Sequence, residues 1–166
     1  MAIVSDSELQ HLTSQVAQCL IDLNWRLSVA ESCTGGWLGK CCTDLAGSST
    51  WFERGFITYS NQAKQDCLHV NQSTLHQFGA VSEQTASEMA QGALTESMAD
   101  ISVAITGIAG PDGGTVDKPV GTVCFAWMSK KSVVQTQCYH LEGDRESVRR
   151  QAVKLALQGI MKNARD

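Results

Sequence analysis

The sequence predicts an α/β fold, a three-layer α/β/α sandwich whose sheet is mixed. Helical apolar spacing alternates along the chain with short β-branched segments, and polar, glycine-bearing turns follow two of those segments. Near the carboxyl end, two strand-like segments adjoin each other and predict a hairpin. A length of 166 residues suits one domain, and we expect residues 1–166 to form it.

The chain opens with a predicted helix, strand, turn and second helix. Ser5 or Asp6 can cap the first helix, whose apolar residues recur at spacings of three and four: Leu9, Leu12, Val16, Cys19 or Leu20, and Leu23. A short strand at residues 27–30 leads into the polar turn 31–36. The second helix then carries apolar side chains on one side: Trp37, Leu38, Cys41 and Leu45.

The middle of the chain predicts a strand and two helices. Residues 52–59 are rich in aromatic and β-branched side chains, which favours a strand. Asn61 can cap a short helix that contains Lys64. Another helix begins near Ser82 and runs to about Met98.

The last third predicts three strands and a long helix. A buried strand at 101–105 ends in the glycine-rich stretch 106–114. Segments 120–128 and 133–141 then form the hairpin, so the sheet combines parallel and antiparallel strands. Asp144 caps the final helix, whose buried face is marked by apolar residues: Val148, Ala152, Leu155, Ala156 and Ile160.

Composition excludes several classes of partner. The formal net charge is −4 and no basic run occurs, so nucleic acid is not expected as the main partner. No apolar run approaches the ~20 residues of a membrane span. The four histidines are scattered without zinc spacing, and we expect no metal and no cofactor. The chain has seven cysteines, an odd number, and no signal peptide at its start, so reduced thiols in a cytoplasmic protein are expected.

Two loops follow predicted strands, where ligands of open α/β sheets tend to bind. The first supplies Glu31, Thr34, Gly35 and Gly36, and it opens a helix whose positive end favours an oxyanion or a phosphate. The second begins with Thr106 and Gly107. Tight turns explain the glycines equally well, because short glycine motifs occur in many unrelated proteins.

A second group of candidates is Ser48, Tyr59 and Lys64. A serine is a poor nucleophile until a base takes its proton, and a lysine with a lowered pKa can be that base. Tyr59 closes a strand and Lys64 follows in the next helix, so both can reach one mouth of the sheet. An exposed lysine and a half-buried tyrosine are the more common case for such residues.

Two further residues are candidates. Cys33 is a rival nucleophile because it lies near a helix N-terminus, where a thiol pKa tends to fall, although no histidine is evidently placed to support it. Arg145 begins the last helix and can hold a phosphate or a carboxylate by a bidentate contact. A solvated position in the first helical turn is the alternative for Arg145.

Several segments together resemble the CinA C-terminal domain family. In order they are residues 30–36 (AESCTGG), 47–49 (GSS), 52–61 (FERGFITYSN), 63–64 (AK), 79–82 (GAVS), 106–114 (TGIAGPDGG) and 118–123 (KPVGTV). Each is weak alone, but their order and spacing match across nearly the whole chain. The resemblance implies metal-independent hydrolysis of the amide of nicotinamide mononucleotide to nicotinic acid mononucleotide and ammonia, a step of NAD salvage. A catalytically silent nucleotide-binding relative is the alternative.

The resemblance also implies roles for the candidate residues. A serine would be the nucleophile, with Lys64 as its base and Tyr59 assisting. Both Ser32 and Ser48 match family motifs. We favour Ser48, because the other loop is then free to donate to an oxyanion or phosphate, although Ser32 has the better strand-to-helix turn. The glycine loops and Thr106 would line the substrate, and Arg145 would contact its phosphate. A homodimer is the default for an enzyme of this size.

Overall fold

The computed structural model describes residues 3–165 and contains one five-stranded sheet. The strands are β1 (Leu27–Glu31), β2 (Phe52–Ile57), β3 (Ile101–Gly107), β4 (Thr122–Ser129) and β5 (Ser132–His140), in the spatial order β2-β1-β3-β4-β5. Strand β1 pairs in parallel with β2 and β3, whereas β4 is antiparallel to both β3 and β5. The mixed sheet and its hairpin are therefore confirmed.

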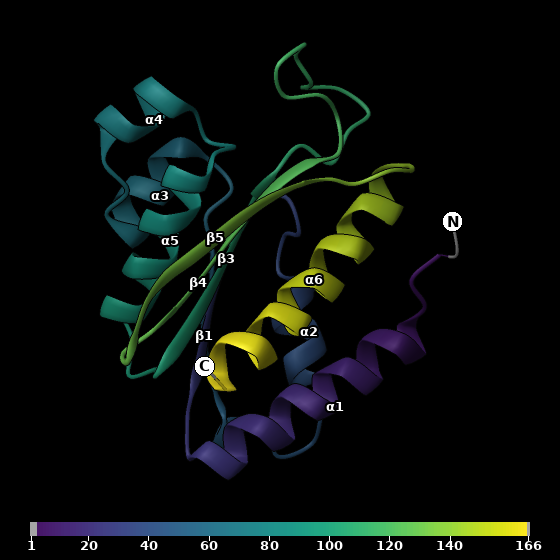
Figure 1. Ribbon diagram of the computed structural model, residues 1–166, viewed down its shortest axis with the longest axis vertical. Helices are drawn as coiled ribbons and strands as arrows, with labels where there is room; N and C mark the ends of the chain where they lie inside the picture. The colour runs from purple at the N-terminus through teal and green to yellow at the C-terminus, as the bar shows by residue number, and fades with distance from the viewer. Residues whose placement is uncertain (1–2, 166) are drawn as a thin grey trace.

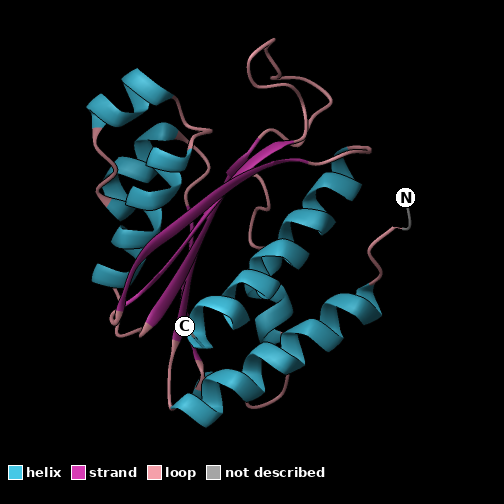
Figure 2. Ribbon diagram, viewed as in Figure 1, coloured by secondary structure: helices cyan, strands magenta, loops and turns pink. Residues whose placement is uncertain are grey.

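Helices cover both faces of the sheet and make the three predicted layers (Figures 1 and 2). One layer holds α1 (Asp6–Leu23), α2 (Trp37–Thr43) and α6 (Arg145–Arg165). The other holds α3 (Asn61–Leu68), α4 (Gln72–Phe78) and α5 (Glu83–Thr95). A short 3-10 helix, η1 (Ser48–Thr50), precedes β2.

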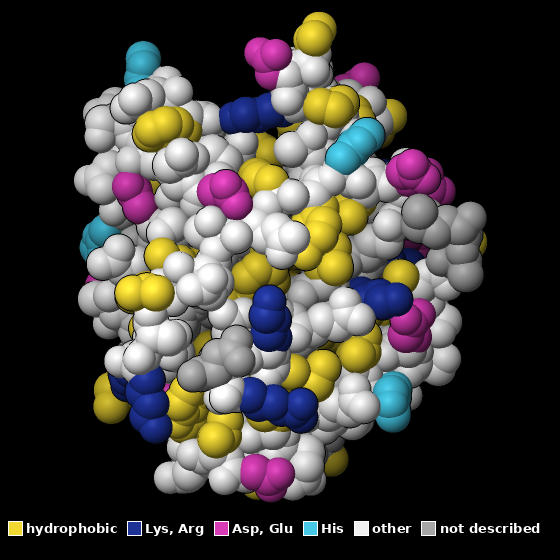
Figure 3. Space-filling view, viewed as in Figure 1, with side chains coloured by type: hydrophobic (Ala, Val, Ile, Leu, Met, Phe, Trp, Pro, Cys, Tyr) yellow, Lys and Arg dark blue, Asp and Glu magenta, His cyan; other side chains and the backbone are white. Residues whose placement is uncertain are grey.

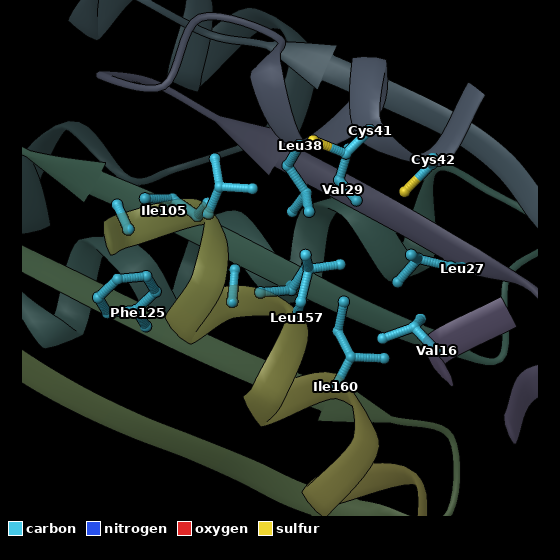
Figure 4. Close-up of a cluster of buried hydrophobic side chains, with 14 of the residues drawn as sticks. Val16, Leu27, Val29, Leu38, Cys41, Cys42, Ile105, Phe125, Leu157 and Ile160 are labelled. Atoms are coloured by element: carbon cyan, nitrogen blue, oxygen red, sulfur yellow. The ribbon is translucent and has the colours of Figure 1, made fainter. Parts of the chain in front are cut away.

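Two apolar clusters lie on opposite faces of the sheet. Side chains alternate between the faces along each strand, so Val103 and Ile105 of β3 pack in the cluster under α1, α2 and α6, whereas Ala104 packs under α5. Figure 4 shows the larger cluster, in which Leu157 and Ile160 of α6 face Leu27 and Val29 of β1 as well as Ile105. Because both faces of β3 are covered, residues 101–106 of this strand are all buried.

Most predicted helix boundaries agree with the structure. The hydroxyls of Ser5 and Ser82 accept hydrogen bonds from backbone N–H groups and cap α1 and α5. Ser60, not Asn61, caps α3, because its hydroxyl accepts from Ala63 N at 3.0 Å. Helix α4 was not predicted, since it buries only Thr74 and Leu75 and shows no apolar period.

The face of α6 and the state of two cysteines also differ from expectation. Leu155 is only half-buried, whereas Leu157 is fully buried. Cys124 and Cys138 form a disulfide, which corrects the expectation of reduced thiols. The register of the β4–β5 hairpin, which was not predicted, places these two residues directly opposite each other. The other five cysteines are free.

The surface agrees with the predicted lack of a basic stripe on the side that Figure 3 shows. There, Lys and Arg side chains lie apart from one another among acidic, apolar and uncharged ones. Within residues 3–165, no helix has the length and apolar character needed to cross a membrane.

Candidate active site

The candidate site lies at the carboxyl edge of the three parallel strands. Glu31 at the end of β1 is level with Ile57 of β2 and Ile105 of β3, so the chain leaves all three strands side by side. Ser32 N donates to Ile105 O at 3.0 Å, and Thr58 N donates to Glu31 O at 2.9 Å. These bonds continue the sheet by one residue, and they fix where the loops after β1 and β2 begin.

Lys64 reaches this edge from α3 and contacts Ser32. Its Nζ lies 3.1 Å from Ser32 Oγ and donates to Thr58 O at 2.8 Å. A longer contact of 3.5 Å joins it to Tyr59 O. The Lys64 side chain is 1% exposed and Ser32 is 7% exposed, so the pair is buried. As an ammonium, Nζ donates to the two carbonyl oxygens and to the Ser32 hydroxyl oxygen; after loss of one proton, its lone pair can accept the hydroxyl proton instead.

Burial changes the pKa of both reactive side chains next to Ser32. Desolvation lowers the pKa of Lys64 from 10.5 to about 8, so a large fraction of this amine is neutral slightly above neutral pH. Desolvation also raises the pKa of the Cys33 thiol from 9.0 to about 11, and the nearby charges do not offset it. Cys33 therefore stays a neutral thiol at physiological pH, which weakens it as a nucleophile.

Glu31 holds the turn between β1 and α2. Its two carboxylate oxygens accept hydrogen bonds from Gly36 N, Leu38 N and Gly39 N at 3.1, 3.1 and 2.8 Å. The side chain caps α2 from within the preceding strand and is 1% exposed. The Glu31 carboxylate thus binds three backbone donors of the turn, and its contact with substrate stays a prediction.

The glycines of this turn have conformations that side chains disfavour. Gly35 and Gly36 have φ of 58° and 96°. A Cβ on Gly36 would also lie 2.9 Å from Ile57 Cδ1. Helix α2 therefore starts close beside β2. In the same turn, the backbone N–H groups of Cys33 and Thr34 donate to no other residue within 3–165.

Arg149 of α6 contacts the same turn and was missed by the sequence analysis. Its Nε donates to Cys33 O at 3.0 Å, and its Nη2 donates to Thr34 O at 2.9 Å. The guanidinium also stacks on the Trp37 ring, 5.0 Å from its centroid. One signal was available, because Arg149 lies four positions after Arg145 and so shares its helix face.

Tyr59 and Arg145 meet at the outer rim of the site. Arg145 Nη2 donates to Tyr59 Oη at 3.3 Å, and Nη1 donates to Gly110 O at 2.7 Å. The structure thus joins Arg145 to the glycine loop after β3. Tyr59 is 63% exposed, and it touches Lys64 through its carbonyl rather than its phenol.

The loops at this edge contain threonine and glycine residues that pack against the protein or remain without a hydrogen-bond partner within residues 3–165. Thr106 donates through its hydroxyl to Ala80 O at 2.7 Å, and Gly107 has no space for a Cβ, which would lie 2.8 Å from Val123 Cγ2. The hydroxyls of Thr34 and Thr58 are buried without a hydrogen-bond partner among the described residues. Buried polar atoms of this kind are available to a ligand or a water.

Ser48 does not join this cluster, which corrects our preference for it beside Lys64. It begins η1, ahead of β2, whereas Lys64 follows the end of β2. Leu27 N donates to Trp51 O at the amino edge of β1, so η1 lies at the opposite edge of the sheet from Ser32. In neighbouring parallel strands, the segments that directly precede the strands lie at one edge of the sheet, and the segments that directly follow them lie at the opposite edge.

The described residues form a buried serine–lysine pair beside unpaired backbone donors and two arginines. Such a pair can activate a hydroxyl for attack on an acyl carbon. No three His, Cys, Asp or Glu side chains of residues 3–165 are grouped to hold a metal ion.

The sequence matches a known protein family along almost its whole length, as its motifs predicted. Residues 9–164 match the family model described as the CinA C-terminal domain. The chain belongs to the CinA C-terminal domain family. Two relatives named "Nicotinamide-nucleotide amidohydrolase PncC" are similar along nearly their whole length. The one from Escherichia coli strain K12 is 53% identical over 95% of both chains. The one from Enterobacter agglomerans is 49% identical over 96% of this chain and 97% of its own.

Solved structures of competence/damage-inducible proteins have the same fold. The competence/damage inducible protein CihA from Agrobacterium tumefaciens superposes with a TM-score of 0.91 at 40% identity and covers 98% of both chains. A CinA superfamily protein from Klebsiella pneumoniae 700603 also gives a TM-score of 0.91, at 41% identity over 95% of this chain and 98% of its own. The CinA family assignment therefore holds for both sequence and structure.

Proposed function

We propose that this protein hydrolyses the carboxamide of nicotinamide mononucleotide and releases nicotinic acid mononucleotide and ammonia. The observation that carries the proposal is the buried Ser32 hydroxyl 3.1 Å from Lys64 Nζ. Relatives at 49–53% identity, named nicotinamide-nucleotide amidohydrolases, support this substrate and reaction.

In the proposed first step, Lys64 is the base and Ser32 the nucleophile. Neutral Lys64 takes the proton of Ser32, whose Oγ forms a bond to the carboxamide carbon. The carbonyl oxygen becomes an oxyanion. The Lys64 ammonium then gives its proton to the amide nitrogen, the C–N bond breaks and ammonia leaves.

The second step releases the acid. Lys64, neutral again, takes a proton from a water whose oxygen attacks the Ser32 ester. The bond to Ser32 Oγ breaks, Lys64 returns the proton to that oxygen, and nicotinic acid mononucleotide leaves as a carboxylic acid whose proton passes to the released ammonia. This sequence consumes one water and needs no metal, so activity should persist in a chelator.

The remaining residues bind and orient the mononucleotide in this proposal. The exposed Arg145 guanidinium, at the N-terminus of α6, contacts the phosphate. Tyr59, hydrogen-bonded to Arg145, offers an exposed ring beside the pyridine. The turns that contain Gly35, Gly36 and Gly107 line the substrate, and the glycines let these turns pack against Ile57 and Val123.

The decisive experiment measures ammonia release from nicotinamide mononucleotide in a chelator. We expect Ser32→Ala and Lys64→Met to lose more than about 10³-fold in kcat while remaining folded. Ser48→Ala is the matched control and should stay within about threefold of wild type. Loss of activity in Ser48→Ala alone would overturn the Ser32 assignment. A wild type that gains thermal stability from the mononucleotide yet forms no product would be a silent nucleotide-binding protein.

We also propose that the protein is a cytoplasmic enzyme of NAD salvage and that it acts as a homodimer. Support for a dimer comes from β5, an edge strand of nine residues with mostly exposed side chains and no charge. Such an edge favours pairing with another strand. Sedimentation equilibrium should give twice the mass of 17.9 kDa, and a monomer at working concentrations would contradict the dimer.

A further inference from the structure

The guanidinium of Arg149 donates hydrogen bonds to backbone carbonyl oxygens and is not paired with a carboxylate of the described residues. Its Nε and Nη2 donate to Cys33 O and Thr34 O, two consecutive carbonyls of the turn that follows Ser32. None of the ion pairs among residues 3–165 includes Arg149. A half-buried guanidinium without a carboxylate therefore holds the peptide groups next to the nucleophile.

Because peptide groups are planar, a hydrogen bond that fixes one carbonyl also fixes the direction of the N–H group of the next residue. In a trans peptide the C=O and the N–H of the next residue point in opposite directions. Holding Cys33 O toward Arg149 therefore directs the Thr34 N–H away from α6. The second carbonyl directs the Gly35 N–H in the same way, and that group already donates to Ser32 O at 3.0 Å. The Thr34 N–H donates to no residue of 3–165 and is available to a ligand.

Arg149 and Lys64 approach the turn from opposite layers of the fold. Arg149 belongs to α6, and Lys64 belongs to α3 on the other face of the sheet (Figure 1). The Thr34 N–H points away from the Arg149 guanidinium that holds Cys33 O, and Lys64 contacts the neighbouring Ser32 from the other layer. An oxyanion formed by attack of Ser32 needs a donor of this kind.

We infer that Arg149 is a positioning residue, which orients the Thr34 N–H as an oxyanion donor for the acyl chemistry of Ser32. This role rests on the proposed function. Arg149 contacts no reacting atom in it. Its bidentate contact fixes a peptide group that otherwise has few constraints, because Gly35 and Gly36 follow directly.

The neighbouring Arg150 provides a matched control. Its guanidinium lies 4.9 Å from the centroid of the same Trp37 ring, but it pairs with Asp6 and Glu146 rather than with the turn. Arg149→Met and Arg150→Met each remove one positive charge from adjacent positions of α6 and keep an apolar stem. Only the first removes the contacts to Cys33 O and Thr34 O. Arg149→Lys keeps the charge but cannot hold two carbonyls in a rigid fork.

We expect Arg149→Met to lower kcat about 10²-fold, the usual effect of losing one oxyanion donor, with KM within about threefold of wild type. Arg149→Lys should fall between Arg149→Met and wild type, and Arg150→Met should stay within about threefold of wild type in both constants. Added guanidinium should restore at least about tenfold of the kcat lost in Arg149→Ala and none of that lost in Ser32→Ala. The midpoint of the pH–rate profile should not move in Arg149→Met.

Three kinetic results would overturn the inference. A raised KM with unchanged kcat would make Arg149 a substrate contact. Equal losses in Arg149→Met and Arg150→Met would indicate a general effect on α6. An absence of guanidinium rescue, combined with full activity of Arg149→Lys, would reduce the role to charge alone.

Amide hydrogen exchange separates this inference from the proposed function. The Gly35 N–H should exchange at least about tenfold faster in Arg149→Met than in Arg150→Met, because the turn that it closes is released. If wild type forms no ammonia, the proposed function fails. Unchanged exchange at Gly35 would then refute the positioning role on its own, and faster exchange would retain Arg149 as the residue that orders this turn.

Discussion

Lys64 Nζ lies 3.1 Å from Ser32 Oγ, although the two residues are 32 positions apart in the chain. The contact exists because β1 and β2 are parallel neighbours and end at the same level. Ser32 is the first residue after β1, and the short link from β2 to α3 turns Lys64 back over it. Burial of this pair sets the pH and stability behaviour that the following predictions use.

The pH dependence of the reaction should report the pKa of Lys64. We expect kcat/KM to rise about fivefold from pH 7 to pH 8 and to level off near pH 9, because Lys64 acts only when neutral. Rates should be measured from pH 7 to 10, above the substrate phosphate pKa of about 6. A rate independent of pH across this range would contradict Lys64 as the base.

The same pKa shift should affect folding. The pKa of Lys64 falls from 10.5 to about 8 on folding, so between these values the folded protein binds fewer protons than the unfolded chain. Stability therefore rises with pH in this window, and the burial penalty is fully present below pH 8. Relative to Lys64→Met, wild type should gain about 1 kcal/mol between pH 8.5 and 9.5 in urea unfolding.

The control for this measurement is Lys162→Met, on the exposed side of α6. Its stability should follow that of wild type over the same pH interval. An equal pH response in Lys64→Met and wild type would show that the Lys64 amine is solvated in the folded protein.

Cys33 should be dispensable for the reaction. Burial raises the pKa of its thiol to about 11, so little thiolate forms at neutral pH. Cys33→Ala should keep kcat within about threefold of wild type. Mass spectrometry after brief iodoacetamide treatment should find the exposed Cys67 alkylated well before Cys33. Rapid loss of activity together with alkylation of Cys33 would instead favour a thiol nucleophile.

Glu31 should act on stability through α2. Glu31→Gln replaces one acceptor oxygen by an NH₂ group and removes the charge that three backbone donors share. We expect a loss of about 2 kcal/mol in the free energy of unfolding, measured in urea. Glu83→Gln, an exposed residue in the first turn of α5, should cost less than about 0.5 kcal/mol. If the Glu31→Gln protein is as stable as wild type but has a strongly raised KM, Glu31 contacts the substrate.

Local patterns in the sequence predicted most elements, because capping and apolar period act over a few residues. Ser5, one of the two residues expected to cap the first helix, does cap α1, α5 begins next to Ser82 as predicted, and the β4–β5 pair is a hairpin. Helix α4 escaped because its short, mostly polar sequence has no period. The Cys124–Cys138 disulfide escaped because it depends on the register of two strands.

The sequence by itself determined the mixed α/β/α architecture, the family, and a set of candidate residues that included Lys64 and both serines. Tertiary structure alone decided that Ser32 lies beside Lys64, that Ser48 lies at the other edge of the sheet, and that Arg149 holds the intervening turn. The physical reason is that strand order sets these distances. Parallel pairing of β1 with β2 and β3 depends on burial of both sheet faces across the whole chain, and no short segment contains that information.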